Sequence, residues 1–214
     1  LFAAALLPTA LVVEHAFAQA DSEEDEPKEV NTSAELSKKK QRLLTALTSD
    51  EGVLINVTRK ELPASPDILN LGRRATKALA RAVADNVDDG VRIRCANLLG
   101  RIGDRSALSA LHGATEAWDA DVRRAAVAAL ERVPDPSSFE PLQRLVVRED
   151  EEGDIAAHAL RTLGMLGDQR AVRLLRAELR KPGRRAAAFT GLWRSRHLMA
   201  RSTLIEDVKF AIAV

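Results

Sequence analysis

The 214 residues are enough for one ordinary domain and a tail. Apolar residues make up 46% of the chain, but aromatic residues only 3% and Tyr is absent, so closely packed helices are favoured over a β-sandwich. The net charge of +1 combines an acidic segment, Asp21 to Glu29, with a mildly basic remainder. Cys95 is the only cysteine, which excludes an intrachain disulfide, a CxxC redox pair and a thiolate zinc cage.

The first part of the chain is typical of an export signal. An apolar run from Leu1 to Val13 is followed by two small-x-small motifs, which end at Ala18 and Ala20. We expect residues 1–20 to be a signal peptide, which makes the mature protein periplasmic or secreted. The alternative is an internal hydrophobic helix of a chain whose start is missing, because Leu1 is not Met. Residues 21–33 are acidic and nearly devoid of apolar side chains, which predicts a disordered linker.

A leading helix is expected from Ala34 to Thr48, where leucines recur at helical spacing. It would cap the first of the units that follow, and together with the next residues it forms a predicted segment, 34–66. Residues Val53 to Val57 are compatible with either a short strand or a loop.

The strongest pattern in the chain is an internal repeat. Val91, Val122 and Ile155 begin three similar segments that are offset by 31 and then 33 residues. Within the first segment the apolar residues fall on one stripe of an α-helix, and the third segment repeats that stripe. The residues of the first stripe are Val91, Cys95, Leu98, Leu99 and Ile102.

Each of these helices ends at a short break that contains Asp104, Asp135 or Asp168. Gly or Pro before each Asp ends the helix, and the Asp can cap the next one. The second helices are predicted at Arg105–Thr115, Ser137–Arg148 and Gln169–Arg180, with one more at Leu71–Val83 before the first unit. Neither helix of a unit can bury its stripe alone, so the units must stack. The predicted fold is an all-α, right-handed α-solenoid of antiparallel helix pairs over residues 67–214. Beyond Lys181 the pattern decays, which indicates either an atypical terminal unit or a functional departure.

Two motifs carry a family resemblance. Asp121-Val-Arg-Arg-Ala-Ala126 and Leu99-Gly-Arg-Ile-Gly-Asp104 resemble the short HEAT repeats of the PBS-lyase, or E-Z, class. The resemblance covers about residues 68–207. It is specific for the fold but weak for function, because such repeats occur in lyase subunits, hydroxylases, DNA-binding proteins and adaptors.

No constellation of catalytic residues or metal ligands is evident, so we expect no catalytic centre, metal or cofactor. His112, His158 and His197 occupy unrelated places in the repeat, and none is followed by the Glu of the HEAT-type hydroxylases. Cys95 shares its repeat position with Ala126 and Ala159, which favours a small buried side chain over a nucleophile.

The candidate binding residues are arginines and one tryptophan. In a HEAT stack the first helix of each unit lines the concave face, so its arginines could form a ladder for carboxylates or phosphates. The structural alternative, that these arginines pair within the stack, is favoured. Trp118 lies between helices and is a hot-spot candidate if exposed, whereas Trp193 is expected to pack. The candidates are Arg92, Arg123, Arg185, Arg124, Arg184 and Trp118.

The sequence therefore predicts an exported, non-enzymatic scaffold that binds a protein partner through its concave face. An acidic partner surface would suit the arginines. Nucleic acid is a poor candidate, because aromatic stacking residues are scarce, and no integral membrane span is expected. The alternatives are an enzyme subunit that handles a small ligand near Cys95 or His158, and a nucleic-acid binder that is not exported.

Overall fold

A computed structural model describes residues 29–49, 53–148 and 151–195. The chain divides into two compact units, Leu1–Ser37 and Lys38–Val214. The predicted signal peptide and most of the predicted linker lie outside the described residues. Of the smaller unit only the start of helix α1 is described. Helix α1 spans Glu29–Ala46 and begins five residues earlier than the sequence predicted.

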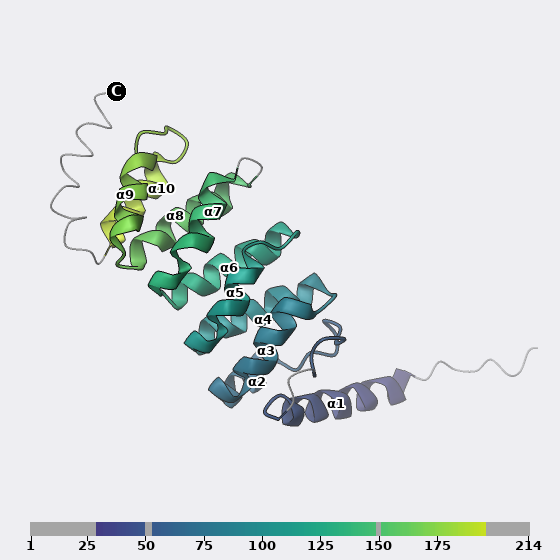
Figure 1. Cartoon of the computed structure of the whole chain (residues 1–214). Coiled ribbons are helices and arrows are strands. Elements are labelled where there is room, and N and C mark those ends of the chain that lie inside the picture. The colour runs from purple at the N-terminus through teal and green to yellow at the C-terminus, as the bar shows by residue number, and fades with distance from the viewer. Residues whose placement is uncertain (1–28, 50–52, 149–150, 196–214) are drawn as a thin grey trace, which may run out of the picture. The chain divides into compact units, whose positions relative to one another are not determined.

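The described part of the larger unit is all helical, with helices packed in succession, which confirms an α-solenoid (Figure 1). Its handedness stays a prediction. After α1 the helices are α2 (Ser65–Leu71), η1 (Gly72–Ala75), α3 (Thr76–Asp85), α4 (Asp89–Ile102), η2 (Arg105–Ala107), α5 (Leu108–Ala114), α6 (Ala120–Arg132), η3 (Pro136–Ser138), α7 (Phe139–Val147), α8 (Gly153–Met165), α9 (Gln169–Glu178) and α10 (Arg185–Arg194).

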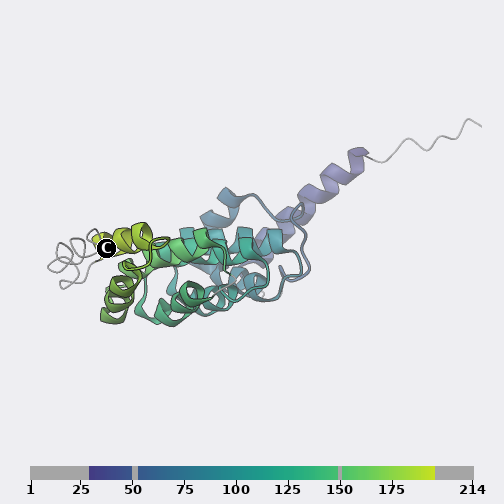
Figure 2. The same ribbon diagram turned by 90° about the horizontal axis from the view of Figure 1, so that it is seen from above.

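The helices form two layers in the larger unit (Figure 2). The first helices of the units, α4, α6, α8 and α10, pack on one another in that order. The second helices, α3, α5, α7 and α9, each pack on the first helix that follows. Val91, Val122 and Ile155 are fully buried, so the repeated apolar stripe faces the shared core as predicted.

The breaks between helices are built as the repeat predicts. Asp104, Asp135 and Asp168 each accept a hydrogen bond from the backbone N–H two residues later. Gly103 ends α4 with a φ of 73°, a left-handed conformation that a side chain disfavours. Two further caps were not predicted: Asp88 caps α4 and Asp119 caps α6.

The segment before the repeats is a loop and not a strand. Residues Val53 to Asn56 form turns, and buried Asn86 donates hydrogen bonds to the carbonyls of Leu54 and Val57. The predicted helix Leu71–Val83 is interrupted by η1 at Gly72 and continues as α3. Leu47 of the leading segment is buried in the core, which fits its predicted capping role. Within the described residues, no helix is long and apolar enough to cross a bilayer.

A very close approach between helices is made by glycines in α8 and α10. A Cβ built on Gly164 would lie 1.9 Å from the carbonyl oxygen of Gly191. A Cβ on Gly191 would in turn lie 2.5 Å from the carbonyl oxygen of Leu160. The two backbones therefore touch at a place where no larger residue fits.

Candidate partner-binding surface

The arginines predicted to form a ladder lie against the ends of the second helices. The Nε of Arg92 donates to the carbonyl of Val83 at 3.0 Å, and that of Arg185 donates to Leu179 at 3.2 Å. Arg123 Nη1 donates to the carbonyls of Ala117 at 2.9 Å and Trp118 at 2.7 Å. Carbonyls at a helix C-terminus lack partners within the helix. Arg92 and Arg185 therefore cap the ends of α3 and α9, whereas Arg123 binds the loop between α5 and α6.

The third unit has Ala156 at this position of the repeat, and another arginine takes over. Arg184, at the start of α10, donates from Nη1 to the carbonyl of Val146 in the last turn of α7. The same group lies 3.3 Å from the buried carboxylate of Glu178. The end of α7 is thus capped from the following unit, which sequence alignment of the repeats did not indicate.

Arg123 is the most deeply engaged of these residues. Its Nε and Nη2 pair with both carboxylate oxygens of Glu151, at 2.8 and 2.9 Å. The side chains of Arg123 and Glu151 are 6% and 0% exposed. A buried, bidentate pair holds its geometry firmly, so Arg123 fixes the loop before α6 rather than offering a charge to the surface.

Arg124 is half-buried and lies among three carboxylates. It donates to Asp154 at 3.0 Å, to Glu152 at 2.5 Å and to Asp121. The hydrogen bond to Asp154 is the main cause that raises the pKa of Arg124. These contacts support the structural interpretation of the predicted ladder, and a partner-binding role of its arginines stays a prediction.

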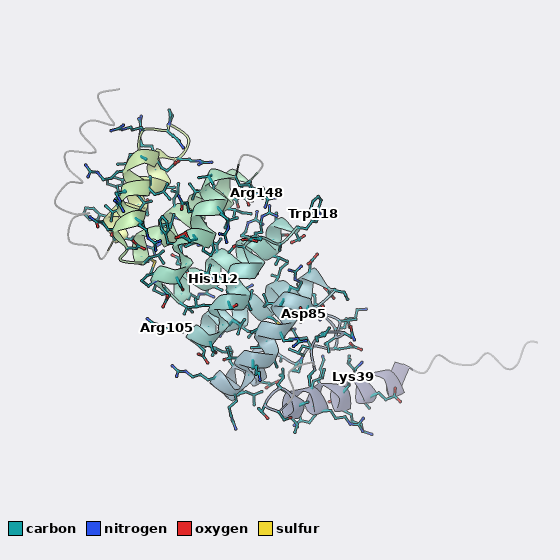
Figure 3. All side chains as sticks on the ribbon, viewed as in Figure 1. Lys39, Asp85, Arg105, His112, Trp118 and Arg148 are labelled. Atoms are coloured by element: carbon teal, nitrogen blue, oxygen red, sulfur yellow. The ribbon has the colours of Figure 1, made fainter. Side chains whose placement is uncertain are left out.

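Trp118 lies in the open. It is 95% exposed and stands directly before Asp119, the cap of α6. Val87, which is 85% exposed, stands in the same place before Asp88, and Val147, 59% exposed, ends α7. Figure 3 shows Trp118 projecting from the edge of the stack. We call these three residues, Val87, Trp118 and Val147, the apolar edge.

Trp193 corrects one prediction. It was expected to pack, but it is 66% exposed on α10 and stacks on Phe189, with 6.4 Å between the ring centroids. Trp193 and Phe189 stand at the repeat positions of Gly164 and Leu160, through which α8 packs on α10. The face of α8 that carries these positions packs on α10, whereas the corresponding face of α10 is exposed.

The histidines stay apart within the described residues. His112 shares a hydrogen bond of 2.9 Å with Ser138, and burial lowers its pKa. His158 lies 2.8 Å from Glu131, which also accepts from Arg194 at 2.7 Å. Burial alone would raise the pKa of Glu131, but the bonds from His158 and Arg194 bring it below its ordinary value. No group of three potential metal ligands occurs in the described ranges.

Cys95 is fully buried in the core. Burial raises the pKa of its thiol to about 12, so the thiolate needed for nucleophilic attack is scarce at neutral pH. The position therefore suits a packing residue, as its repeat column predicted.

Four other arginines in the first-helix layer were not among the predicted binding residues. Arg94 and Arg101 on α4, Arg132 on α6 and Arg161 on α8 have no carboxylate partner among the described residues. The helical spacing of Arg94, Asn97 and Arg101, on the flank of the apolar stripe, was the available signal. It is weaker than the signal of the Arg92 column, which recurs in more units.

The comparison with protein families agrees with this architecture. Residues 111–193 match the family model of HEAT repeats. Residues 111–193 are therefore HEAT repeats. The match runs from α5 to α10, and within it the HEAT units carry Trp118 and Arg123. The PBS-lyase subclass stays a resemblance. Among curated proteins, no relative matches the chain.

Proposed function

We propose that this HEAT-repeat protein is a non-enzymatic scaffold that binds a protein partner through the apolar edge. HEAT repeats commonly serve as protein-interaction scaffolds. The observation that carries the proposal is Trp118, which exposes 95% of its surface on a backbone that is tied down. Tryptophan is the residue most enriched in binding hot spots, and large exposed apolar groups in monomers are uncommon.

The support beneath Trp118 strengthens this proposal. Its carbonyl accepts a hydrogen bond from the buried side chain of Arg123, so the loop is ordered before a partner arrives. Pre-ordering reduces the entropy lost on binding. Arginines that the sequence suggested as a gripping surface on the concave face would then act indirectly. Arg123 holds the loop that presents Trp118. Arg92 and Arg184 bind the last turns of α3 and α7, close to Val87 and Val147.

The test is capture by the tagged chain, compared with the variant Trp118→Ala. A matched control is Trp193→Ala, which removes another exposed tryptophan, on α10. A protein recovered by the native chain and by the control, but not by Trp118→Ala, is then purified and its Kd measured. We expect Trp118→Ala to cost about 2 kcal/mol or more, about thirtyfold in Kd. Equal affinities of the native chain and Trp118→Ala would overturn the proposal.

Export belongs to the same proposal. The apolar run and the small-x-small motifs before Asp21 support it. Fusion of residues 1–20 to a reporter that is active only outside the cytoplasm tests it: an inactive reporter would mean that the partner must be sought inside the cell.

A further inference from the structure

A second candidate site lies on α4. A pocket of about 350 Å³ is lined by three arginines, Arg59, Arg94 and Arg101, together with Asn97 and the apolar side chains of Ile93 and Leu98. Arg59 comes from the loop before α2, so the pocket joins residues far apart in the sequence. All of its lining residues belong to the larger unit.

The charges of this pocket are unbalanced. None of its three guanidinium groups has a carboxylate within 4.0 Å among the described residues, and no acidic residue lines the pocket. Elsewhere in the first-helix layer, Arg123 and Arg124 are surrounded by carboxylates. Like charges around one hollow repel each other, and a bound anion relieves that repulsion.

The side chain of Arg94 and the backbone of Arg59 are held by hydrogen bonds. Arg94 donates from Nη2 to the carbonyl of Pro63 at 2.6 Å and from Nε to Ser65 Oγ at 3.3 Å. A guanidinium has five N–H donors, so three remain for a ligand. The backbone N–H of Arg59 donates to the cap residue Asp88 at 3.2 Å. A Cβ built on Gly90 would lie 3.3 Å from the Cδ of Arg59. Glycine at this position therefore leaves room for the Arg59 side chain.

The basic surface continues beyond the pocket. Arg132 stands at the repeat position of Arg101, and Arg161 at that of Asn97, and neither has a carboxylate partner in the described ranges. A row of arginines without carboxylate partners on successive first helices suits an extended ligand with several anionic groups better than a single small ion. The apolar floor of Ile93 and Leu98 suits the methylene groups of acidic side chains.

We propose that this pocket binds a carboxylate-rich peptide segment of a partner protein, with Asp or Glu side chains paired to Arg59, Arg94 and Arg101. Arginine forks match carboxylates in bidentate geometry. The row through Arg132 and Arg161 takes the continuation of the segment. This site is independent of the apolar edge, so either can fail alone.

The test uses the full chain and a fluorescent oligoglutamate peptide, with binding followed by anisotropy at low and high ionic strength. Arg101→Glu is the decisive variant, because the Arg101 side chain makes no hydrogen bond to the described residues whose loss could unfold the chain. Arg94→Gln/Arg101→Gln is the second variant, and Arg173→Gln, an exposed arginine on α9, is the matched control. Circular dichroism verifies that each variant is folded.

We expect both pocket variants to weaken peptide binding about tenfold or more, with the control and Trp118→Ala unchanged. Binding should also weaken as salt increases. The proposal is overturned if the control loses as much affinity as Arg101→Glu, or if an oligoglutamine peptide binds equally well. It is also overturned if inorganic phosphate or a single-stranded oligonucleotide displaces the peptide at lower concentration, because the preferred ligand is then of another class.

Discussion

Gly164→Ala should separate α8 from α10. The added Cβ would lie 1.9 Å from the Gly191 carbonyl oxygen and 2.8 Å from the Gly191 Cα, whereas ordinary contacts exceed about 3 Å. The obstacle is backbone, so no side-chain rotation can relieve it. Overpacking of this kind costs about 1–3 kcal/mol and sometimes more. The gain from replacing a helical glycine by alanine is only about 1 kcal/mol.

We therefore expect a net loss of about 2 kcal/mol for Gly164→Ala. In a chain of this size that lowers Tm by about 4–8 °C. Urea unfolding followed by circular dichroism measures it, and Trp193 fluorescence reports on α10 in the background Trp118→Phe. In a repeat protein α10 can detach before the rest, so the Trp193 transition should shift more than the helical signal.

The matched control is Gly113→Ala in α5. An added Cβ there meets nothing within 4 Å, so only helix propensity acts and stability should rise by about 0.5–1 kcal/mol. Opposite signs for the two substitutions are the expected result. If Gly164→Ala is as stable as Gly113→Ala, the two backbones do not touch and the description of this interface is wrong.

Three further predictions concern stability and reactivity. Arg123→Ala should lower the free energy of unfolding in urea by about 3–5 kcal/mol, because it leaves the buried carboxylate of Glu151 without its partner. Arg105→Ala removes an exposed pair with Asp135 and should lower it by less than about 1 kcal/mol. Similar losses for both variants would refute the structural role of Arg123. Cys95, whose pKa burial raises to about 12, should react with a thiol reagent only after denaturant is added, and rapid labelling of the native chain would contradict its burial. Three capping carboxylates have pKa values lowered from 3.8 by hydrogen bonds: Asp104 by Ser106, Asp135 by Ser137 and Asp168 by Arg170. The ionised carboxylates therefore stabilise the fold above about pH 4, and this stabilisation is lost as pH falls below 3.8. Asp135→Asn keeps a capping side chain without a charge, and the decline of its urea midpoint between pH 5 and pH 3 should be shallower than that of the native chain; an equal decline would exclude Asp135 as a contributor.

The sequence by itself determined the helix pairs of the repeats, their order and the Asp caps at the start of the second helices. The residues of the repeated stripe, such as Val91 and Leu99, are buried as their spacing required, because helical periodicity alone states which face must leave water. Asp104 and its equivalents cap the second helices for an equally local reason, since the donors that they satisfy lie two residues away.

Only the tertiary structure decided which groups the polar side chains contact. Arg92 and Arg123 share a repeat column with Arg185, but sequence could not show which carbonyls they reach. Arg92 and Arg185 bind the ends of the preceding helices, and Arg123 binds the loop before α6. Arg59 and Arg94 meet at one pocket because a loop crosses α4, a contact that no periodicity encodes. A long, flexible side chain has many partners within reach, and the packing of neighbouring units selects among them.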